Sequence, residues 1–315
     1  MNGLCLSRDF FTAEGVPLLV GSHRETMPYL AAGLVGEGSE CFGVDDERSC
    51  DHDWGAGFCI WLPDDVFEKK AHCIADDLRL LPGFAGVGSK FASMAGANDG
   101  RIGVFPITGF YRRFIGFDHV PETLEEWWAV PDANLATVTN GGIFCDRWGE
   151  FSRWRESLAG GYPRDIKLKK MAYCCYLAMQ AGQYNYERTV RRRLYGAAAI
   201  VEATFTMAAL RLAYYLNDAY PPFYKWVQPL VKELPLLGRE SFMYSEALAD
   251  PLADVELRGV DKVEIVSRWC RDLARAICES GLATDPDSDL YSIAVELHAS
   301  ISEGWLRRIP LEVPC

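Results

Sequence analysis

The chain has 315 residues, a length that predicts about two domains. Hydrophobic residues make up 49% of it and charged residues 24%, which is typical of a globular protein with a sizeable core. The formal net charge of −12 argues against a broad surface for nucleic acid, because such surfaces need clustered Lys and Arg. A local basic strip is still compatible with this charge.

The cysteines and the apolar runs indicate the cellular compartment of the protein. The 11 cysteines are odd in number and contain no CxxC pair, so neither a zinc site nor a disulfide framework is expected. No basic segment precedes an apolar stretch at the N-terminus. The longest apolar run, 195–216, is interrupted by Glu202 and Arg211 and predicts a buried helix. We therefore expect a cytoplasmic protein without a membrane partner.

The first half of the chain mixes helix and strand patterns. Residues 6–30 predict helix with a break near Gly21 and Ser22, where Ser22 and Glu25 have the spacing of a capping box. Short apolar runs bounded by turn residues predict four strands, at 31–35, 51–62, 102–107 and around 143–144. Helices are predicted at 63–81, where the first turn is acidic, and at 124–130.

The second half shows only helical periodicity. Apolar residues recur at spacings of three and four in five segments: 167–183, 188–217, 222–234 (with a kink at Pro229), 262–280 and 287–308. We therefore predict an α+β protein of two domains. A mixed-sheet domain with flanking helices spans 1–160, and an all-helical bundle that closes a cleft spans 161–315.

Two short motifs in the first half carry chemistry. Gly38 ends a turn after a strand, where the backbone can approach a ligand, and Ser39 adds a hydroxyl suited to phosphate oxygens. Asp51 and Asp53 are two residues apart, so on a strand they share one face. One or two carboxylates commonly hold Mg²⁺ together with a nucleoside triphosphate. The plain alternative is a Gly-Ser turn followed by two solvated aspartates.

The pair of motifs, separated by the 11 residues from Glu40 to Cys50, resembles the signature of the DNA-polymerase-beta-like nucleotidyltransferase superfamily. Within it, an uncharacterised bacterial family of unknown function is similar in four blocks: 33–55, 140–146, 180–186 and 220–226. The resemblance implies a nucleotidyltransferase fold and a Mg²⁺- or Mn²⁺-dependent reaction. That reaction would transfer a nucleoside monophosphate, most simply AMP from ATP, and release pyrophosphate. We expect the acceptor to be a small molecule rather than a nucleic acid.

Several further residues remain open to two interpretations. Lys225, between Tyr224 and Trp226, is either a surface lysine or, as in related transferases, a helical-domain lysine that reaches the triphosphate. Arg188, followed by Arg191-Arg192-Arg193, is either a solvated helix face or a nucleotide- or acceptor-binding edge.

The loop before the two aspartates is also open to interpretation. Asp45 and Asp46 would cap that loop or join the metal site. We expect Ser49 to shape the turn and His52 to be a packed histidine.

One departure from the superfamily pattern concerns a third carboxylate. The resemblance places it on the strand at 102–107, where Gly103 occupies the slot. Asp99 and Asp146 are candidate substitutes. The alternatives to an active transferase are a catalytically degenerate nucleotide-binding regulator and a toxin or defence transferase acting on a protein or tRNA.

Overall fold

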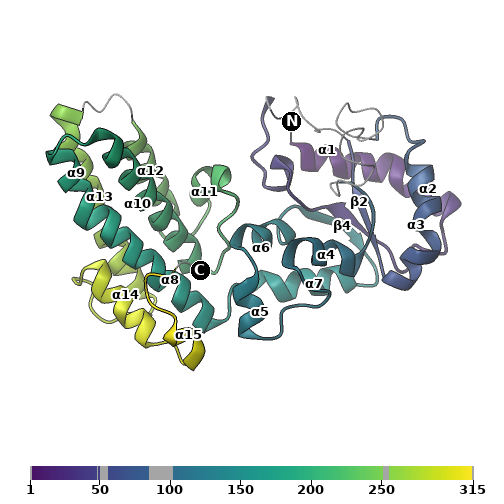
Figure 1. Ribbon diagram of the computed structural model, residues 1–315. Helices are drawn as coiled ribbons and strands as arrows, with labels where there is room; N and C mark the ends of the chain where they lie inside the picture. The colour runs from purple at the N-terminus through teal and green to yellow at the C-terminus, as the bar shows by residue number, and fades with distance from the viewer. Residues whose placement is uncertain (1, 48, 50–55, 85–101, 251–254, 314–315) are drawn as a thin grey trace. The chain divides into compact units, whose positions relative to one another are not determined.

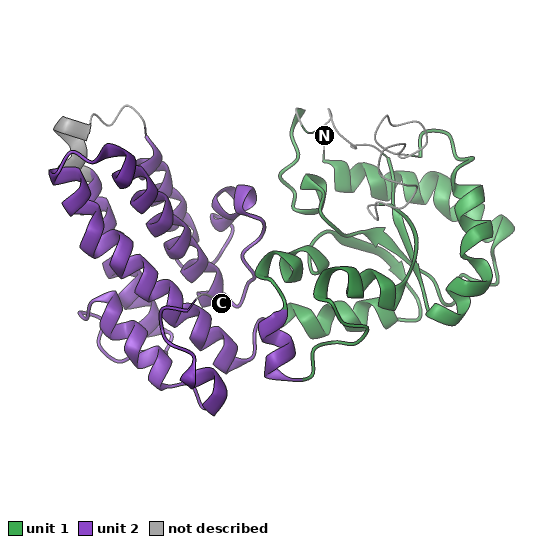
Figure 2. Ribbon diagram, viewed as in Figure 1, with its two compact units in different colours: residues 1–122, 130–160 green, residues 123–129, 161–315 purple. Residues whose placement is uncertain are grey.

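The computed structural model describes residues 2–47, 49, 56–84, 102–250 and 255–313, and for 255–261 the backbone only. The chain divides into two compact units, coloured separately in Figure 2. The α/β unit comprises residues 1–122 and 130–160, and the helical unit comprises 123–129 and 161–315. The short segment 123–129 therefore belongs to the helical unit, although it lies within the expected first domain.

A four-stranded mixed sheet forms the centre of the α/β unit (Figure 1). Its order is β3-β2-β1-β4, and β1 is antiparallel to both of its neighbours whereas β2 and β3 are parallel. The four strands fall where the sequence predicts them, but the second begins later than expected. Their bounds are β1 (Ala31–Leu34), β2 (Cys59–Leu62), β3 (Gly103–Pro106) and β4 (Gly142–Asp146).

Helices cover both faces of this sheet. Strand β2 is an unbroken apolar run with every side chain buried, as expected for a strand covered on both sides. Ile60 packs in a cluster with Phe11 and Ile74, whereas Trp61 stacks on Phe151 at a ring-centroid distance of 3.9 Å. The first face carries α1 (Gly3–Phe10), a π-helical turn (Phe11–Gly15), α2 (Val16–Ser22) and α3 (Asp64–Leu78). The other carries α4 (Ile107–Ile115), α6 (Asp132–Val138) and α7 (Glu150–Ala159).

The predicted capping box at Ser22 is wrong. Ser22 is the last residue of α2, and the chain then turns rather than starting a helix. Pro28 disfavours helical backbone in the residue before it, which outweighs the capping spacing. Glu25 instead pairs with Lys70 of α3 at 2.9 Å.

The helical unit contains no strand within its described residues, as predicted. Two expected long helices are each divided: Arg193 has a left-handed φ of 56° between α9 and α10, and a turn separates α14 from α15. The elements are α5 (Leu124–Ala129), α8 (Arg164–Ala178), a π-helical segment (Met179–Tyr186), α9 (Glu187–Arg191), α10 (Tyr195–Leu216), α11 (Tyr224–Val231), α12 (Gly238–Ala249), α13 (Val255–Glu279), α14 (Leu290–Ala299) and α15 (Gly304–Arg308).

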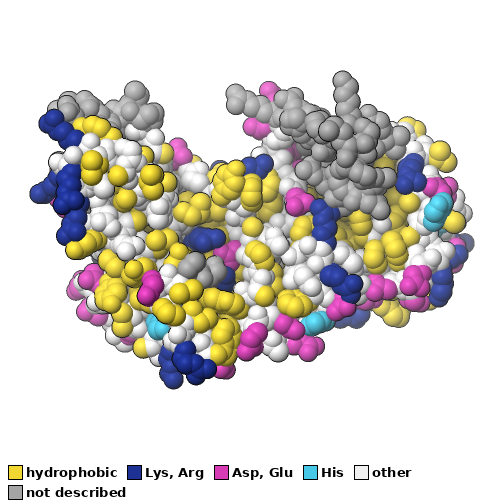
Figure 3. Space-filling view, in the orientation of Figure 1, with side chains coloured by type: hydrophobic (Ala, Val, Ile, Leu, Met, Phe, Trp, Pro, Cys, Tyr) yellow, Lys and Arg dark blue, Asp and Glu magenta, His cyan; other side chains and the backbone are white. Residues whose placement is uncertain are grey.

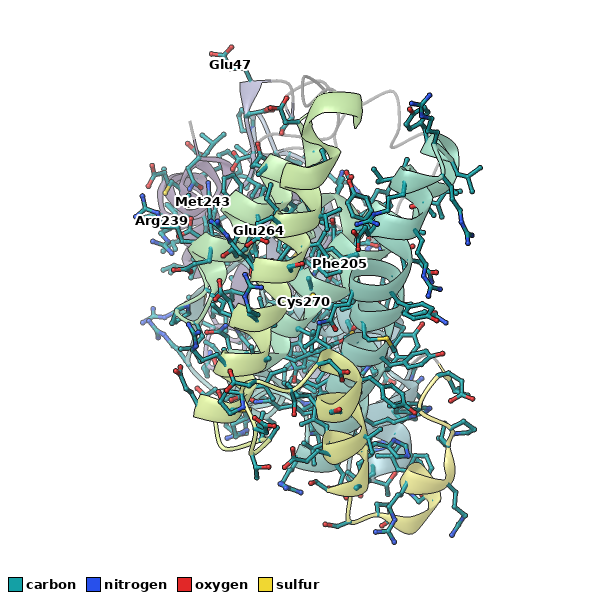
Figure 4. All side chains as sticks on the ribbon, turned by 90° about the vertical axis from the view of Figure 1, so that its left-hand side faces the viewer. Glu47, Phe205, Arg239, Met243, Glu264 and Cys270 are labelled. Atoms are coloured by element: carbon teal, nitrogen blue, oxygen red, sulfur yellow. The ribbon has the colours of Figure 1, made fainter. Side chains whose placement is uncertain are left out.

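Helix α10 is the core helix of this unit. It is the one helix of the described chain long and apolar enough to cross a membrane, with a mean hydropathy of 1.3 over its most apolar 18-residue window. Its Phe205, however, packs edge-on against Trp269 of α13 at 5.4 Å. In Figure 4, Phe205 and Cys270 lie among the helices, whereas Met243 lies on α12, where its side chain is exposed. The buried side of α10 therefore packs within the helical unit.

Candidate functional site

One edge of the sheet collects the ends of all four strands. Gly33, near the carboxyl end of β1, pairs with Cys59 at the start of β2, and Cys59 pairs with Gly103 at the start of β3. Leu34, the last residue of β1, pairs with Gly142 at the start of β4. We call this the motif edge. The chain leaves it after Leu34 and returns at Cys59, so the segment carrying both predicted motifs begins and ends there.

Gly38 and Ser39 form a tight turn beyond β1. Gly38 precedes a single turn of 3-10 helix, Ser39–Cys41, whose first hydrogen bond runs from the Cys41 N–H to the Gly38 carbonyl at 3.1 Å. The Ser39 carbonyl accepts the N–H groups of Phe42 and Val44 at 3.1 and 3.0 Å. A Cβ at Gly38 would lie 2.1 Å from the Glu40 carboxylate. Glycine therefore lets Glu40 fold back over the turn, and Ser39 is half-buried at its start.

The side chain of Asn140 braces this turn. The N–H of Gly36 donates to Asn140 Oδ1 at 3.1 Å, and Asn140 Nδ2 donates to the Gly36 carbonyl at 2.7 Å. The amide thus satisfies both polar groups of a buried residue, much as a neighbouring strand would. It fixes where the chain emerges from β1, two residues before Gly38.

Arg155 and Gly141 complete the brace. Arg155 of α7 donates to the carbonyls of Asn140 and Gly141 at 2.5 and 3.4 Å. Burial lowers the pKa of its guanidinium, which nevertheless stays charged in proteins. The Gly141 N–H donates to the Cys41 carbonyl at 2.8 Å. Gly141 has a φ of +62°, and a Cβ there would lie 2.0 Å from the Leu34 carbonyl, so glycine is required.

Arg113 places a positive charge at the motif edge. It lies in the last turn of α4 and donates to the Glu37 carboxylate at 2.8 Å, with 37% of its side chain exposed. Its charge also favours the thiolate of Cys59, but burial dominates and raises the pKa of that thiol to about 12. Cys59 is therefore a neutral core residue, and Arg113 is the nearby group free to meet an anion if Glu37 releases it.

The loop after the turn contains local caps. Asp46 Oδ1 accepts the N–H of Ser49 at 2.9 Å and its hydroxyl at 3.1 Å, which supports the turn-capping interpretation of Asp46 and the turn-shaping role of Ser49. Asp45 Oδ2 accepts the N–H of Gly3 at 2.7 Å and so joins this loop to the start of α1.

The predicted metal ligands lie outside the described residues. These are Asp51 and Asp53, and His52 between them is outside as well. Among the residues that are described, no group of three or more His, Cys, Asp or Glu side chains could hold a metal ion.

The structure explains why the third-carboxylate slot contains glycine. Gly103 has a φ of +133°, a conformation that side-chain-bearing residues rarely adopt, although a Cβ there would make only an ordinary van der Waals contact with the Phe105 ring at 3.6 Å. Of the two proposed substitutes, Asp99 lies outside the described residues.

Asp146 is wrong as the substitute. It pairs with Ala31 at the far end of β1, opposite the motif edge. Its two carboxylate oxygens accept the N–H groups of Gly149 and Ser152 at 2.8 Å each, at the start of α7. Asp146 therefore caps a helix, a role that its sequence position alone does not reveal.

The two remaining candidates belong to the helical unit. Lys225 is exposed in the first turn of α11, with Nζ 4.5 Å from the centroid of the Trp226 ring. Arg188 is exposed in α9, with its guanidinium carbon 3.7 Å from the centroid of the Tyr184 ring. Each is a cation–π pair of neighbouring surface residues.

Sequence reasoning missed the bracing residues as site residues. In the sequence, Asn140 and Gly141 stand out only as part of a block of resemblance, and no motif marks Arg113 or Arg155. An Asn-Gly-Gly sequence opening a strand is the one local signal, because it pairs a hydrogen-bonding amide with a residue able to adopt positive φ.

Part of the chain is similar to a known protein family. A family model described as a domain of unknown function (DUF4037) matches residues 127–227. This range includes Asn140, Arg155, Arg188 and Lys225, whereas Gly38 and Ser39 lie before it. No curated protein and no solved structure matches the chain. The chain therefore carries, over about a third of its length, a domain similar to a family without an assigned function.

Proposed function

We propose that the protein is a cytoplasmic nucleotidyltransferase that transfers a nucleoside monophosphate, most simply AMP from ATP, to an acceptor and releases pyrophosphate. The motif edge carries this proposal. A rigid turn with a serine follows β1, and the segment containing Asp51 and Asp53 returns to the residue paired with the end of that strand. The two motifs of the nucleotidyltransferase signature are therefore tethered to one edge of one mixed sheet.

Each group at this edge has a role in the proposed reaction. The Ser39 hydroxyl binds phosphate oxygens, and the brace from Asn140 and Arg155 keeps the turn in position. Asp51 and Asp53 supply the hard oxygen ligands that Mg²⁺ or Mn²⁺ prefers. When bound, the cation would stabilise charge on the triphosphate during in-line displacement.

Arg113 is suited to the leaving pyrophosphate. Its ion pair with Glu37 is half exposed, so a polyanion can compete for the guanidinium at little cost. Charge-assisted contacts of this kind are among the stronger hydrogen bonds available to phosphate.

A nucleotide-binding regulator without turnover is the second candidate. Gly103 favours it, because the backbone at that position disfavours any carboxylate-bearing residue. In the transferase, the acceptor's proton must be taken by a group other than a third strand acid.

The test combines binding and transfer. Titration calorimetry of the full chain with Mg-ATP measures binding, and incubation with Mg²⁺ and α-³²P-labelled triphosphates in cell lysate detects transfer. Transfer should vanish in Asp51→Ala and Asp53→Ala. Asp65→Ala is the matched control, because Asp65 lies in the same unit and its ion pair with Lys69 is exposed.

Three results distinguish the candidates. The transferase is supported if label transfer is abolished in both site variants and retained in the control. Binding of Mg-ATP without label transfer or pyrophosphate release supports the regulator. Transfer unaffected by either site variant would show that the reaction occurs elsewhere.

A further inference from the structure

Four arginines form an exposed strip on the helical unit. The arginine strip consists of Arg188, Arg191, Arg192 and Arg193, all exposed, at the end of α9 and in the turn before α10. No Asp or Glu occurs between Glu187 and Glu202. Figure 3 shows dark-blue side chains gathered along the edge of this unit where Figure 1 places α9. On a chain of net charge −12 this is a local concentration of positive charge.

The backbone of the turn holds the strip in a defined shape. The N–H of Arg192 donates to the Arg188 carbonyl at 3.2 Å, and that of Leu194 donates to the Thr189 carbonyl at 3.0 Å. Arg193 has a φ of 56°, which ends α9 in the manner of a helix C-cap. The arginines are therefore presented on an ordered turn between two helices.

The arginines of the strip differ in their acidic partners. Arg191 pairs with Glu187 at 2.5 Å, one turn earlier in α9. Arg188 and Arg192 form no ion pair with the residues that the structure describes. Two guanidinium groups thus remain available to an anionic partner.

Aromatic rings lie beside these charges. The Arg188 guanidinium lies over the ring of Tyr184, which is 53% exposed, and Tyr195 at the start of α10 is 44% exposed. Exposed aromatic rings are not needed on a helix face that only contacts solvent. Cationic groups that contact phosphates, beside flat rings on which bases stack, are the features of surfaces that bind single-stranded nucleic acid.

We propose that the arginine strip, with Tyr184 and Tyr195, binds single-stranded nucleic acid. Arg188 and Arg192 contact the phosphates, and the tyrosines stack on unpaired bases. Duplexes fit less well, because their bases are already stacked on one another. An anionic membrane or an acidic peptide would satisfy the arginines but would make no use of the rings. The proposal does not depend on nucleotidyl transfer at the motif edge.

The experiment measures fluorescence anisotropy of labelled 12-nucleotide RNA and DNA strands titrated with the full chain at 50 and 200 mM salt. The double variant R188A/R192A should weaken binding about tenfold and lower the salt slope by roughly 1.4, at about 0.7 per lost phosphate contact on a single strand. Tyr184→Ala should weaken it at least about fivefold through lost stacking. These side chains are exposed, so the melting temperature should not change.

Controls separate this surface from other sources of binding. R239A/R308A removes two exposed arginines elsewhere on the helical unit and should bind like the wild type. Asp51→Ala should also bind normally, so that failure of the proposed transferase would leave this result intact. The proposal is overturned if no strand binds at 50 mM salt, or if the strip variant binds like the control. It is also overturned if duplexes, phosphatidylserine vesicles or polyglutamate compete as well as single strands.

Discussion

Replacing Asn140 by alanine tests whether the brace fixes the Gly38-Ser39 turn. The substitution removes two hydrogen bonds to Gly36, each contributing about 1 kcal/mol net. It also leaves the N–H and the carbonyl of the buried Gly36 without their partner. Because Asn140 itself is half-buried, water can partly replace its side chain. Together these effects predict a loss of about 2 to 3 kcal/mol in the α/β unit.

Hydrogen exchange measured by mass spectrometry reports this loss where it occurs. Exchange at the Gly36 amide should accelerate by roughly 30- to 160-fold in Asn140→Ala, the factor that corresponds to the lost free energy. Peptides of the helical unit should keep their exchange rates. Because exchange is followed peptide by peptide, the measurement does not assume that the two units unfold together.

Asn134→Ala is the matched control for this substitution. Asn134 is an asparagine of the same unit whose side-chain Nδ2 donates to the Phe114 carbonyl at 2.7 Å. It should cost about 1 kcal/mol and leave Gly36 protected. Equal exchange at Gly36 in wild type and Asn140→Ala, or equal destabilisation by the two substitutions, would refute the bracing role.

Three further predictions follow from named contacts. Gly103→Asp should lower the melting temperature at a cost on the order of 1–3 kcal/mol without raising label transfer, and Gly103→Ala should lower it similarly, because the strain lies in the backbone. Arg113→Ala should weaken Mg-ATP binding about tenfold in calorimetry with little effect on stability, unlike its neighbour Arg112→Ala, which should bind normally. Burial, then the charge of Lys169, lowers the pKa of His298 below 6.5, with smaller effects from Arg307 and Glu312. The unfolded state therefore binds the proton more readily, so the free energy of unfolding should fall as pH decreases through about 6.5. The melting temperature of His298→Gln, measured between roughly pH 7 and 5, should fall less than that of the wild type.

The coarse fold was predictable because its signals are local. Short apolar runs ended by glycine or proline identified all four strands, and the change to purely helical periodicity identified the composition of the second unit. The α4, α6, α7 and α12 helices were missed although Gly or Pro flanks each of them, because none is longer than 12 residues and so few helical turns show the apolar periodicity. The break at Arg193 was also missed, because a left-handed arginine has no sequence signature.

The candidate site was predictable only in its local part. The turn at Gly38 and Ser39 follows from a strand ending in small residues, and the structure contains that turn. Asn140 and Arg155 could not be assigned to it, because their contacts depend on how β4 lies beside β1. The same dependence made Asp146 a plausible acid by sequence, since only the register places it at the opposite end of the sheet.

The brace also constrains the order in which the site can form. Asn140 is 104 residues from Gly36 in the sequence, so the contact closes a large loop of chain. During synthesis, the signature residues emerge well before the strand and helix that hold their turn. The turn should therefore acquire its final geometry only when β4 docks on β1, late in folding. A fragment ending before residue 140 would contain the whole signature yet lack the support that its turn requires, so the proposed phosphate binding would depend on completion of the sheet.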